Sequence, residues 1–305
     1  MPERDAPVAP RVGAIVPNEG PLPERLGIGR MAAAAEAAGA ESVWVSDHVL
    51  MVDTDVTGYP YSADGRPTWP VDVEYYEAFV CCALMAAATS SCRIGTAALV
   101  LPQRNVLEVA KVAASLDRLS SGRLVLGVGA GWHRPEMEAL GYPFRARGKR
   151  FDEMLDVLRD CWSGRPAPFS GEHVTVPDGV VLSPRPAQPA GPPLLVAGMS
   201  DAALRRAATR GDGWLAIAFA ATWDAGALGE RMTLLRDLAG QAARSAPPRT
   251  VLKLHAKLPE QDRVPSLVCE AAALGFEEIV VELPWELGID VVRRSIASAC
   301  ASAAG

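Results

Sequence analysis

Short apolar runs alternate along this chain with amphipathic, alanine-rich segments. The apolar runs show no alternation of polar and apolar positions, which is typical of strands buried on both faces of a parallel sheet. We expect strands at residues 12–16, 42–45, 94–101, 124–128, 194–197, 214–217, 251–254 and 278–281. We expect helices at residues 26–38, 77–88, 106–119, 147–162, 202–210, 225–243, 264–274 and 291–303.

This order amounts to about eight strand-then-helix units, the number that closes a (β/α)₈ barrel. A doubly wound dinucleotide-binding fold would instead carry G-x-G-x-x-G after a strand. Counted from Gly127 the last position of that pattern is Trp132, and counted from Gly129 it is Arg134. We therefore predict an α/β fold, a (β/α)₈ TIM barrel formed as a single domain by residues 1–305.

Two long segments interrupt the alternation of strands and helices, one after strand 2 and one after helix 4. Residues 50–76 leave the carboxyl end of a strand, which is the active face of such barrels, so this insertion is a candidate lid. Residues 163–193 follow a helix and start from the opposite face. For them a buttress, an oligomer contact and a lid that wraps round all stay open.

Composition narrows the class of protein. The chain is 49% hydrophobic with a net charge of -6, which argues against a nucleic-acid-binding surface. The first seven residues are polar, and no run of about 18 uncharged apolar residues occurs, so we expect a cytoplasmic protein with no signal peptide and no membrane span. The six cysteines lack Cys-x-x-Cys spacing and the four histidines are far apart, so we expect buried thiols and no metal site.

The segment 123–132 is the strongest sign of a ligand. A short apolar strand runs into Gly127, Gly129 and Gly131 and then Trp132. Glycine lets a flat ligand approach the main chain, so Gly129, Ala130, Gly131 and Trp132 are candidates for cofactor contacts.

Other candidates lie where strands end. Asp47 and His48 follow strand 2, and His48 is the candidate for moving a proton near neutral pH. The alternative for this pair is capping or packing at the barrel mouth. On strand 3 the residues Ala97, Ala98 and Val100 leave room for a planar ring, although ordinary barrel packing would use them equally well. After strand 5, Gly198, Met199 and Ser200 open a helix whose free N–H groups suit a phosphate, or form a simple cap.

The substrate candidates come from the first insertion and from the strand ends. Lys253 and His255 face one side of strand 7. Buried polar groups there need hydrogen-bonding partners or contact with solvent at the mouth of the barrel. Aromatic side chains in the first insertion favour a hydrophobic or aromatic substrate. The candidates for substrate contact are Tyr59, Tyr61, Trp69, His133, His255 and Glu282.

Together these segments resemble the bacterial-luciferase-like family of flavin- and deazaflavin-dependent oxidoreductases. The similar stretches are residues 42–48, 94–105, 114–132, 136–148 and 211–214. The resemblance implies a (β/α)₈ barrel with a reduced isoalloxazine-type ring across strands 3 and 4. It also implies a non-proline cis peptide at Ala97–Ala98, a phosphate on Gly198, Met199 and Ser200, and Asp47 and His48 near the ring or the reacting carbon.

The amino-acid sequence of these stretches is most similar to the branch of the family that uses coenzyme F420. Sugar-phosphate dehydrogenases of that branch place a glutamate where this chain has Trp132, so a sugar phosphate is disfavoured. The resemblance implies hydride transfer between coenzyme F420 and an organic substrate, with His48 handling the proton, and a homodimer formed through helices near strands 2 and 3. The alternatives are a monooxygenase that uses O₂ and reduced FMN from a separate reductase, and a non-catalytic flavin-binding member.

Overall fold

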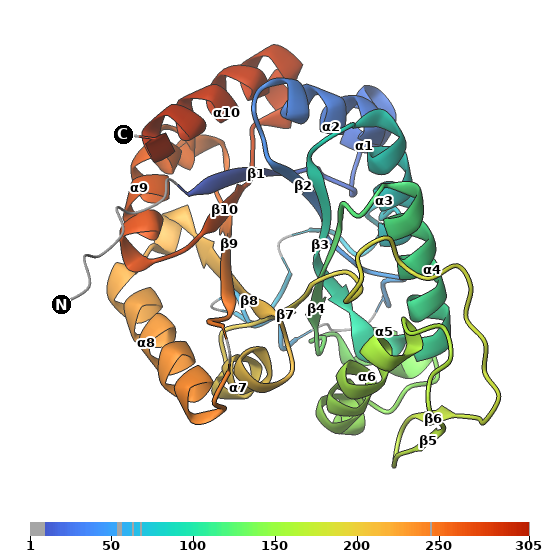
Figure 1. The fold of residues 1–305 in the computed structure, drawn as a ribbon. Coiled ribbons are helices and arrows are strands. Elements are labelled where there is room, and N and C mark those ends of the chain that lie inside the picture. The colour runs from blue at the N-terminus through green and yellow to red at the C-terminus, as the bar shows by residue number, and fades with distance from the viewer. Residues whose placement is uncertain (1–9, 54–56, 63, 68, 245, 305) are drawn as a thin grey trace.

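Eight parallel strands close into a barrel in the computed structural model, which describes residues 10–53, 57–62, 64–67, 69–244 and 246–304. The barrel order is β1, β10, β9, β8, β7, β4, β3, β2 and back to β1 (Figure 1). The barrel strands are β1 (Arg11–Ile15), β2 (Ser42–Val45), β3 (Arg93–Val100), β4 (Leu124–Gly129), β7 (Leu194–Ala197), β8 (Gly213–Phe219), β9 (Arg249–His255) and β10 (Glu278–Val281). The predicted barrel is confirmed, and the doubly wound alternative is wrong because the sheet has no open edge.

Helices form a ring outside the strands (Figure 1). The large ones follow the strands in the predicted order: α2 (Ile28–Ala37), α3 (Ala78–Ala88), α4 (Val106–Leu119), α6 (Arg147–Cys161), α7 (Asp201–Thr209), α8 (Ala225–Gln241), α9 (Val264–Leu274) and α10 (Ile289–Ala304). Two short helices were not predicted: α1 (Leu22–Leu26) and α5 (Arg134–Ala139). Each has only five or six residues, too few for a hydrophobic period to emerge in the sequence.

Local signals in the sequence explain where several helices begin. The side chain of Asn105 accepts hydrogen bonds from the N–H groups of Leu107 and Glu108, and so caps α4. Ser200 and Asp224 cap α7 and α8 in the same way. Polar side chains at these positions satisfy N–H groups that the helix itself leaves free.

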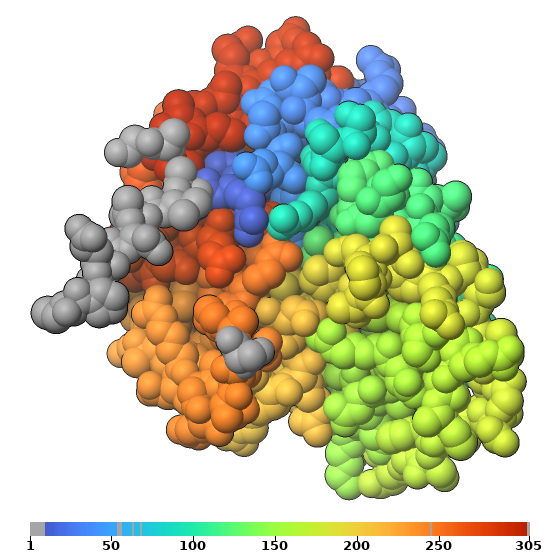
Figure 2. All heavy atoms as spheres, viewed as in Figure 1, coloured from blue at the N-terminus to red at the C-terminus, as the bar shows by residue number. Residues whose placement is uncertain are grey.

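The core has two layers. Inside the barrel one residue from each strand fills the axis, namely Ile15, Trp44, Ala97, Val125, Leu195, Leu215, Val251 and Val280. A larger layer of apolar side chains packs between the strands and the helices. The space-filling view shows side chains closing the middle of the barrel (Figure 2). The barrel is therefore a packed core, and ligands are confined to its ends.

The two long segments that interrupt the alternation of strands and helices lie in different parts of the barrel. The described part of the segment between β2 and α3 crosses one end of the barrel, drawn in light blue in Figure 1. The segment between α6 and β7 carries a small antiparallel pair, β5 (Phe169–Ser170) and β6 (Thr175–Val176). It runs along the outside of α4, where the N–H groups of Ala187 and Gln188 donate to Asp117. Of the interpretations left open, the buttress describes this second segment.

Three further expectations are tested by the structure: a cis peptide, buried thiols and the absence of a membrane span. The cis peptide at Ala97–Ala98 is present. Buried thiols are confirmed for Cys81, Cys82, Cys92 and Cys161 but wrong for Cys269, which is exposed on α9. Among the residues described, no helix is long and apolar enough to cross a membrane. The first seven residues, expected to carry no signal peptide, lie outside the described residues.

Candidate active site

A floor of small residues lies at the carboxyl ends of β3, β4 and β7. A Cβ atom added to Gly129 would lie 3.8 Å from the Cβ atoms of both Ala98 and Ala197, which is ordinary contact without overlap. Ala98, Gly129, Ala130, Gly131 and Ala197 are all partly exposed. The backbone at the ends of three adjacent strands is thus partly accessible from the mouth.

The floor is shaped where β3 leaves the regular ladder. Pairing with β4 shifts between Thr96 and Leu99, so Ala97 and Ala98 lie at an irregularity. The ammonium group of Lys253 on β9 donates to the Ala97 carbonyl at 2.6 Å and to Ser46 Oγ at 3.0 Å. A side chain from the opposite wall of the barrel therefore holds this part of the floor.

Asp47 has both carboxylate oxygens engaged within the protein. Oδ2 accepts from the Val100 N–H at 2.8 Å, and Oδ1 accepts from Arg104 at 2.7 Å. Burial raises the pKa of Asp47, and the guanidinium of Arg104 opposes that shift. The structure thus places Asp47 as the anchor of the end of β3; its direct contact with a cofactor stays a prediction.

The predicted phosphate site lies at the start of α7. Gly198 has φ of 125°, a conformation that glycine adopts readily, and its carbonyl accepts from the Trp214 indole at 2.8 Å. The Ser200 hydroxyl is exposed and accepts from the Ala203 N–H at 3.3 Å. These residues follow Ala197 of the floor directly, and their binding of a phosphate stays a prediction.

His48 is held by a carboxylate that the sequence did not identify as functional. Its Nδ1 lies 2.8 Å from Glu136 Oε2, and both side chains are buried. Oε1 of Glu136 accepts from the Val49 N–H at 2.6 Å and from Gln103 at 3.0 Å. Burial alone would raise the pKa of Glu136, but close polar contacts with His133 and His48 outweigh it and lower the pKa to about 2. An ionised Glu136 accepts the proton on Nδ1, so Nε2 is the nitrogen left for a reaction.

His133 approaches the same carboxylate. Its Nδ1 lies 3.5 Å from Glu136 Oε2, and neither ring nitrogen has a hydrogen-bond partner among the described residues. His48, His133 and Glu136 also form the one group in the described part of the chain with the spacing to hold a metal ion. The sequence argument against a metal used distances along the chain, which the fold overrides for this group. We assign Glu136 to orienting His48, because its oxygens already accept four donors.

Aromatic side chains of the first insertion enclose His48. Trp69 and Tyr75 lie 5.9 Å and 5.2 Å from its ring, centroid to centroid. Tyr59 contacts Trp132 edge-on at 5.1 Å, and Tyr61 contacts Phe219 at the end of β8 at 5.8 Å. The predicted residues Tyr59, Tyr61, Trp69, Trp132 and His133 are thus brought to one mouth, which they screen from water.

His255 and Glu282 lie on the other side of the mouth. His255 stacks on Phe219 at 4.9 Å, and its Nδ1 lies 3.2 Å from Glu282 Oε2. Burial and then the charge of Lys253 lower the pKa of His255, and the hydrogen bond to the Glu282 carboxylate opposes the shift. Burial would raise the pKa of Glu282, but hydrogen bonding and charge from His255 outweigh it and lower the pKa.

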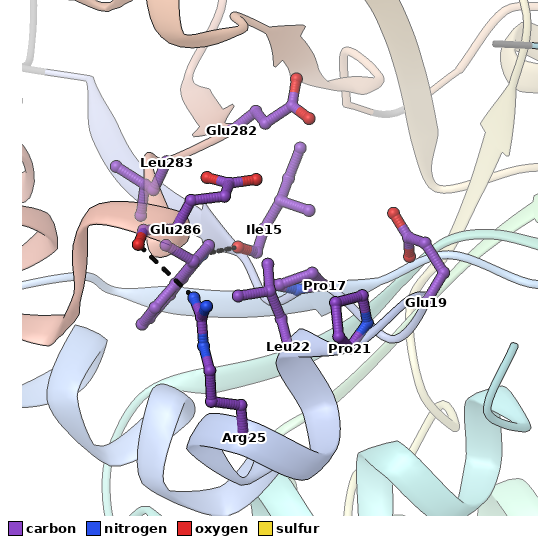
Figure 3. A pocket seen from close by; sticks show the side chains of 10 residues that line it. Ile15, Pro17, Glu19, Pro21, Leu22, Arg25, Glu282, Leu283 and Glu286 are labelled. Atoms are coloured by element: carbon purple, nitrogen blue, oxygen red, sulfur yellow. Dashed lines mark hydrogen bonds between the residues drawn. The ribbon is translucent and has the colours of Figure 1, made fainter. Parts of the chain in front are cut away.

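A pocket of about 270 Å³ opens next to Glu282, between the ends of β1 and β10 (Figure 3). Ile15 lies between Glu282 and Glu19 in this view, and Arg25 reaches from α1 to the carbonyl of Glu286. Burial raises the pKa of the partly buried Glu19, and the charge of Lys253 opposes the shift. Three carboxyl groups, those of Glu19, Glu282 and Glu286, line this pocket.

Glu19, Glu136 and Arg104 were missed as site residues by sequence reasoning. Arg104 and Glu136 belong to stretches that carry the family resemblance, but their partners lie 57 and 88 residues away along the chain. A carboxylate at the start of a short helix is usually a solvated cap, so local sequence offered no signal for Glu136. Glu19 follows the first strand and was a detectable strand-end carboxylate.

Comparison with known proteins agrees with this geometry. The sequence model of the family described as luciferase-like monooxygenases matches residues 15–264. An uncharacterized protein of Mycobacterium tuberculosis is 40% identical over 185 residues, which cover 61% of this chain and 63% of that protein. An F420-dependent glucose-6-phosphate dehydrogenase of Kineococcus radiotolerans is 32% identical over 185 residues, covering 59% of this chain and 49% of that protein.

Solved structures share the fold at low identity. An F420-dependent secondary alcohol dehydrogenase in complex with an F420-acetone adduct has a TM-score of 0.74 at 18% identity, covering 96% of this chain and 99% of that one. The oxygenating constituent of 3,6-diketocamphane monooxygenase from a CAM plasmid of Pseudomonas putida, in complex with FMN, has a TM-score of 0.74 at 16% identity, covering 97% and 98%. These likenesses establish the barrel alone.

Proposed function

The chain belongs to the luciferase-like monooxygenase family, and we propose that it is an oxidoreductase that transfers a hydride between coenzyme F420 and an organic substrate. The observation that carries this proposal is the pairing of a bare backbone floor with an oriented histidine. Ala98, Gly129 and Ala197 leave space for a flat ring, and Glu136 fixes His48 beside that space. The F420-dependent relative of K. radiotolerans supports the choice of coenzyme.

The coenzyme would supply or accept the hydride, and the chain's own residues do the rest. His48 would hold or take the proton at Nε2, because Nδ1 is engaged with Glu136. Gly198, Met199 and Ser200 would bind the phosphate of the coenzyme tail. Tyr59, Trp69 and Trp132 would exclude water and align the substrate over the floor.

The substrate we propose is a small hydrophobic or aromatic molecule that is not a sugar phosphate. Trp132 and His133 stack at 4.9 Å and fill the space beside His48 with rings. Across the mouth, His255 and Glu282 offer hydrogen bonds but no fixed cationic pair for a phosphate. Glucose-6-phosphate is therefore expected to be a poor substrate, despite the activity of the relative from K. radiotolerans.

Titration of the purified protein with coenzyme F420 and with FMN, followed by fluorescence quenching, tests the proposal. We expect F420 to bind at micromolar concentration and FMN to bind more weakly. Gly129→Leu should abolish binding because the side chain would fill the floor, whereas Gly240→Leu, where an added Cβ meets open space, should not. Retention of neither cofactor by the wild-type protein would refute the proposed function.

The second candidate is a monooxygenase that uses reduced FMN and O₂. The structural likeness to the FMN-bound oxygenating constituent from P. putida favours it. In that case a separate reductase would supply the reduced flavin. Turnover under strictly anaerobic conditions separates the two, because hydride transfer with F420 proceeds without O₂ and the monooxygenase reaction stops.

We further propose that two copies of this chain pair through α2 and α3. The exposed face of α3 carries Val80 and Leu84, 59% and 50% exposed, with no charged residue anywhere on the helix. An apolar groove of about 470 Å³ lies between α3 and α2. Leu84→Glu should convert a dimer into a monomer in sedimentation velocity, whereas Leu119→Glu, at the end of α4 and 84% exposed, should leave the dimer intact.

A further inference from the structure

Lys253 is a cation placed inside the barrel, and the proposed proton transfer does not use it. It extends from the middle of β9 toward β2 and β3, and its side chain is 7% exposed. An apolar residue would fill the same space without the large desolvation free energy that burying an ammonium group costs. A cation kept here therefore needs a reason beyond packing.

Its contacts account for only part of this cost. Two of the three N–H bonds of Nζ point to acceptors, the Ala97 carbonyl and Ser46 Oγ. Across the described stretches of the chain, no carboxylate lies within 4.0 Å of this nitrogen. Burial lowers the pKa of the Lys253 ammonium group, and the carboxyl groups of Glu19 and Glu282, which act on it only at longer range, oppose that shift. Among the described residues, the positive charge thus lacks a contact partner of opposite charge.

The acceptor that Lys253 does contact belongs to the floor. Pairing of β3 with β2 ends at Thr96, and pairing with β4 resumes only at Leu99. The carbonyl of Ala97 therefore lies in the gap of both ladders, where a buried acceptor must find another donor. Lys253 provides that donor, and so it links the shape of the floor to a buried positive charge.

We propose that Lys253 is a positioning residue that fixes the Ala97 carbonyl and provides the charge that favours the reduced, anionic form of a bound flavin or deazaflavin ring over the oxidised form. This inference rests on the proposed function. Two-electron reduction followed by loss of a ring proton gives these rings a negative charge, and charge near the ring is a means by which proteins tune them. The effect is one of differential binding, so it is measurable without turnover.

The test compares dissociation constants for oxidised and reduced FMN, and for F420 and its reduced form, measured anaerobically by fluorescence. Lys253→Met keeps the side-chain length and removes both donor and charge. We expect Lys253→Met to weaken binding of the reduced cofactor about tenfold or more, which is the size of one partly screened charge interaction. Binding of the oxidised cofactor should weaken less than about threefold, because that form lacks the added charge.

Two further variants separate shape from charge. Lys253→Gln retains a neutral donor, so it should restore binding of the oxidised form without restoring the preference for the reduced form. Lys257→Met removes an exposed positive charge two residues beyond β9 and should change neither constant. Equal weakening of both redox forms in Lys253→Met would reduce Lys253 to a structural contact and overturn the proposal. The proposal would also be overturned if Lys253→Met bound both forms with the wild-type ratio of dissociation constants.

The outcomes also separate this inference from the function on which it rests. If the wild-type protein binds neither cofactor in either redox state, the proposed function fails and the inference falls with it. If the wild-type protein binds and prefers the reduced form, but Lys253→Met keeps that preference, only the inference about Lys253 fails.

Discussion

The two ends of this barrel treat buried charge in opposite ways. At the amino end, Glu278 accepts from Ser42 at 2.5 Å and lies 3.4, 3.8 and 4.0 Å from Arg249, Arg11 and Arg93. At the carboxyl end, Lys253 lacks an acidic partner in contact, and His133 has two ring nitrogens without hydrogen bonds among the described residues. The first arrangement pairs its charges with one another, whereas the second leaves an ammonium group with no acidic partner in contact among the described residues.

Glycines follow the same division. A Cβ atom on Gly95 would lie 2.1 Å from the indole ring of Trp44, and one on Gly127 would lie 2.1 Å from the Thr96 carbonyl oxygen. Two residues further toward the mouth, a Cβ on Gly129 would meet nothing closer than 3.8 Å. Glycine is therefore required by packing in the barrel interior, and it creates free surface at the mouth. The comparison predicts that changes at the amino end alter stability, while changes at the mouth alter function.

The largest expected effect is on stability, from Glu278→Gln at the amino end. Removing this carboxylate leaves three arginines facing one another, and breaking a buried charge network from one side costs about 3–5 kcal/mol of unfolding free energy. Urea denaturation measures the loss. Glu277→Gln, which removes a half-exposed partner of Arg11, should cost less than about 1 kcal/mol. Equal losses in the two variants would contradict the special role of Glu278.

Next in size is a matched pair of substitutions on one strand. Gly127→Ala should lower the unfolding free energy by about 3 kcal/mol, because the new methyl group overlaps a backbone oxygen and Leu215. Gly129→Ala should lower it by less than about 1 kcal/mol but weaken cofactor binding, since ordinary contacts cost little. Thermal unfolding and cofactor titration on both proteins check the pair. A Gly129→Ala protein as unstable as Gly127→Ala would break the distinction between interior and mouth.

A change at the mouth comes third, and its effect is measured as turnover. His48→Ala should lower kcat by about 100-fold or more if Nε2 moves the proton. Circular dichroism should show an unchanged fold, because His48 packs mainly against rings of the lid and Trp132. Asn in place of His48 keeps a polar group without proton transfer and should be as inactive as Ala. Turnover near the wild-type rate in either variant would dismiss the role of His48.

The smallest effect returns to the amino end and depends on pH. Glu36 accepts hydrogen bonds from the N–H groups of Ser90, Ser91 and Cys92, just before β3. Burial opposes ionisation, but these bonds outweigh it and lower the pKa to about 2. Because the folded pKa lies below the ordinary value of 4.5, this stabilisation is complete above pH 4.5 and is lost as the pH falls toward 2.

Glu36→Gln should therefore lower the unfolding free energy by about 1–2 kcal/mol at pH 7, as for hydrogen bonds to a charged group. The difference from wild type should vanish as the pH approaches 2. Chemical denaturation at several pH values measures it. Glu138→Gln, at an exposed position on α5, should show no such dependence. A difference that grows as the pH falls would contradict the sign of the shift.

The sequence determined the architecture because periodicity is a local property. Unbroken apolar runs such as 278–281 indicated buried parallel strands, and caps such as Asn105 marked helix starts. Gly129 and Gly131 marked the floor, and the position of His48 after β2 marked the mouth. Resemblance to a known family then placed the cis peptide at Ala97–Ala98, which is present. Each of these signals lies within about a dozen residues of the feature it predicts.

Only the tertiary structure decided which groups meet at the mouth. Glu136 reaches His48 across 88 residues, and Lys253 reaches Ala97 across 156. It also showed that Asp47 anchors the end of β3 through the Val100 N–H and that His133 approaches the carboxylate of Glu136, which holds His48. Such pairings depend on barrel closure, which brings strand ends together regardless of their separation along the chain. No local sequence pattern predicts which side chain on the opposite wall of the barrel will be long enough and charged enough to contact the floor.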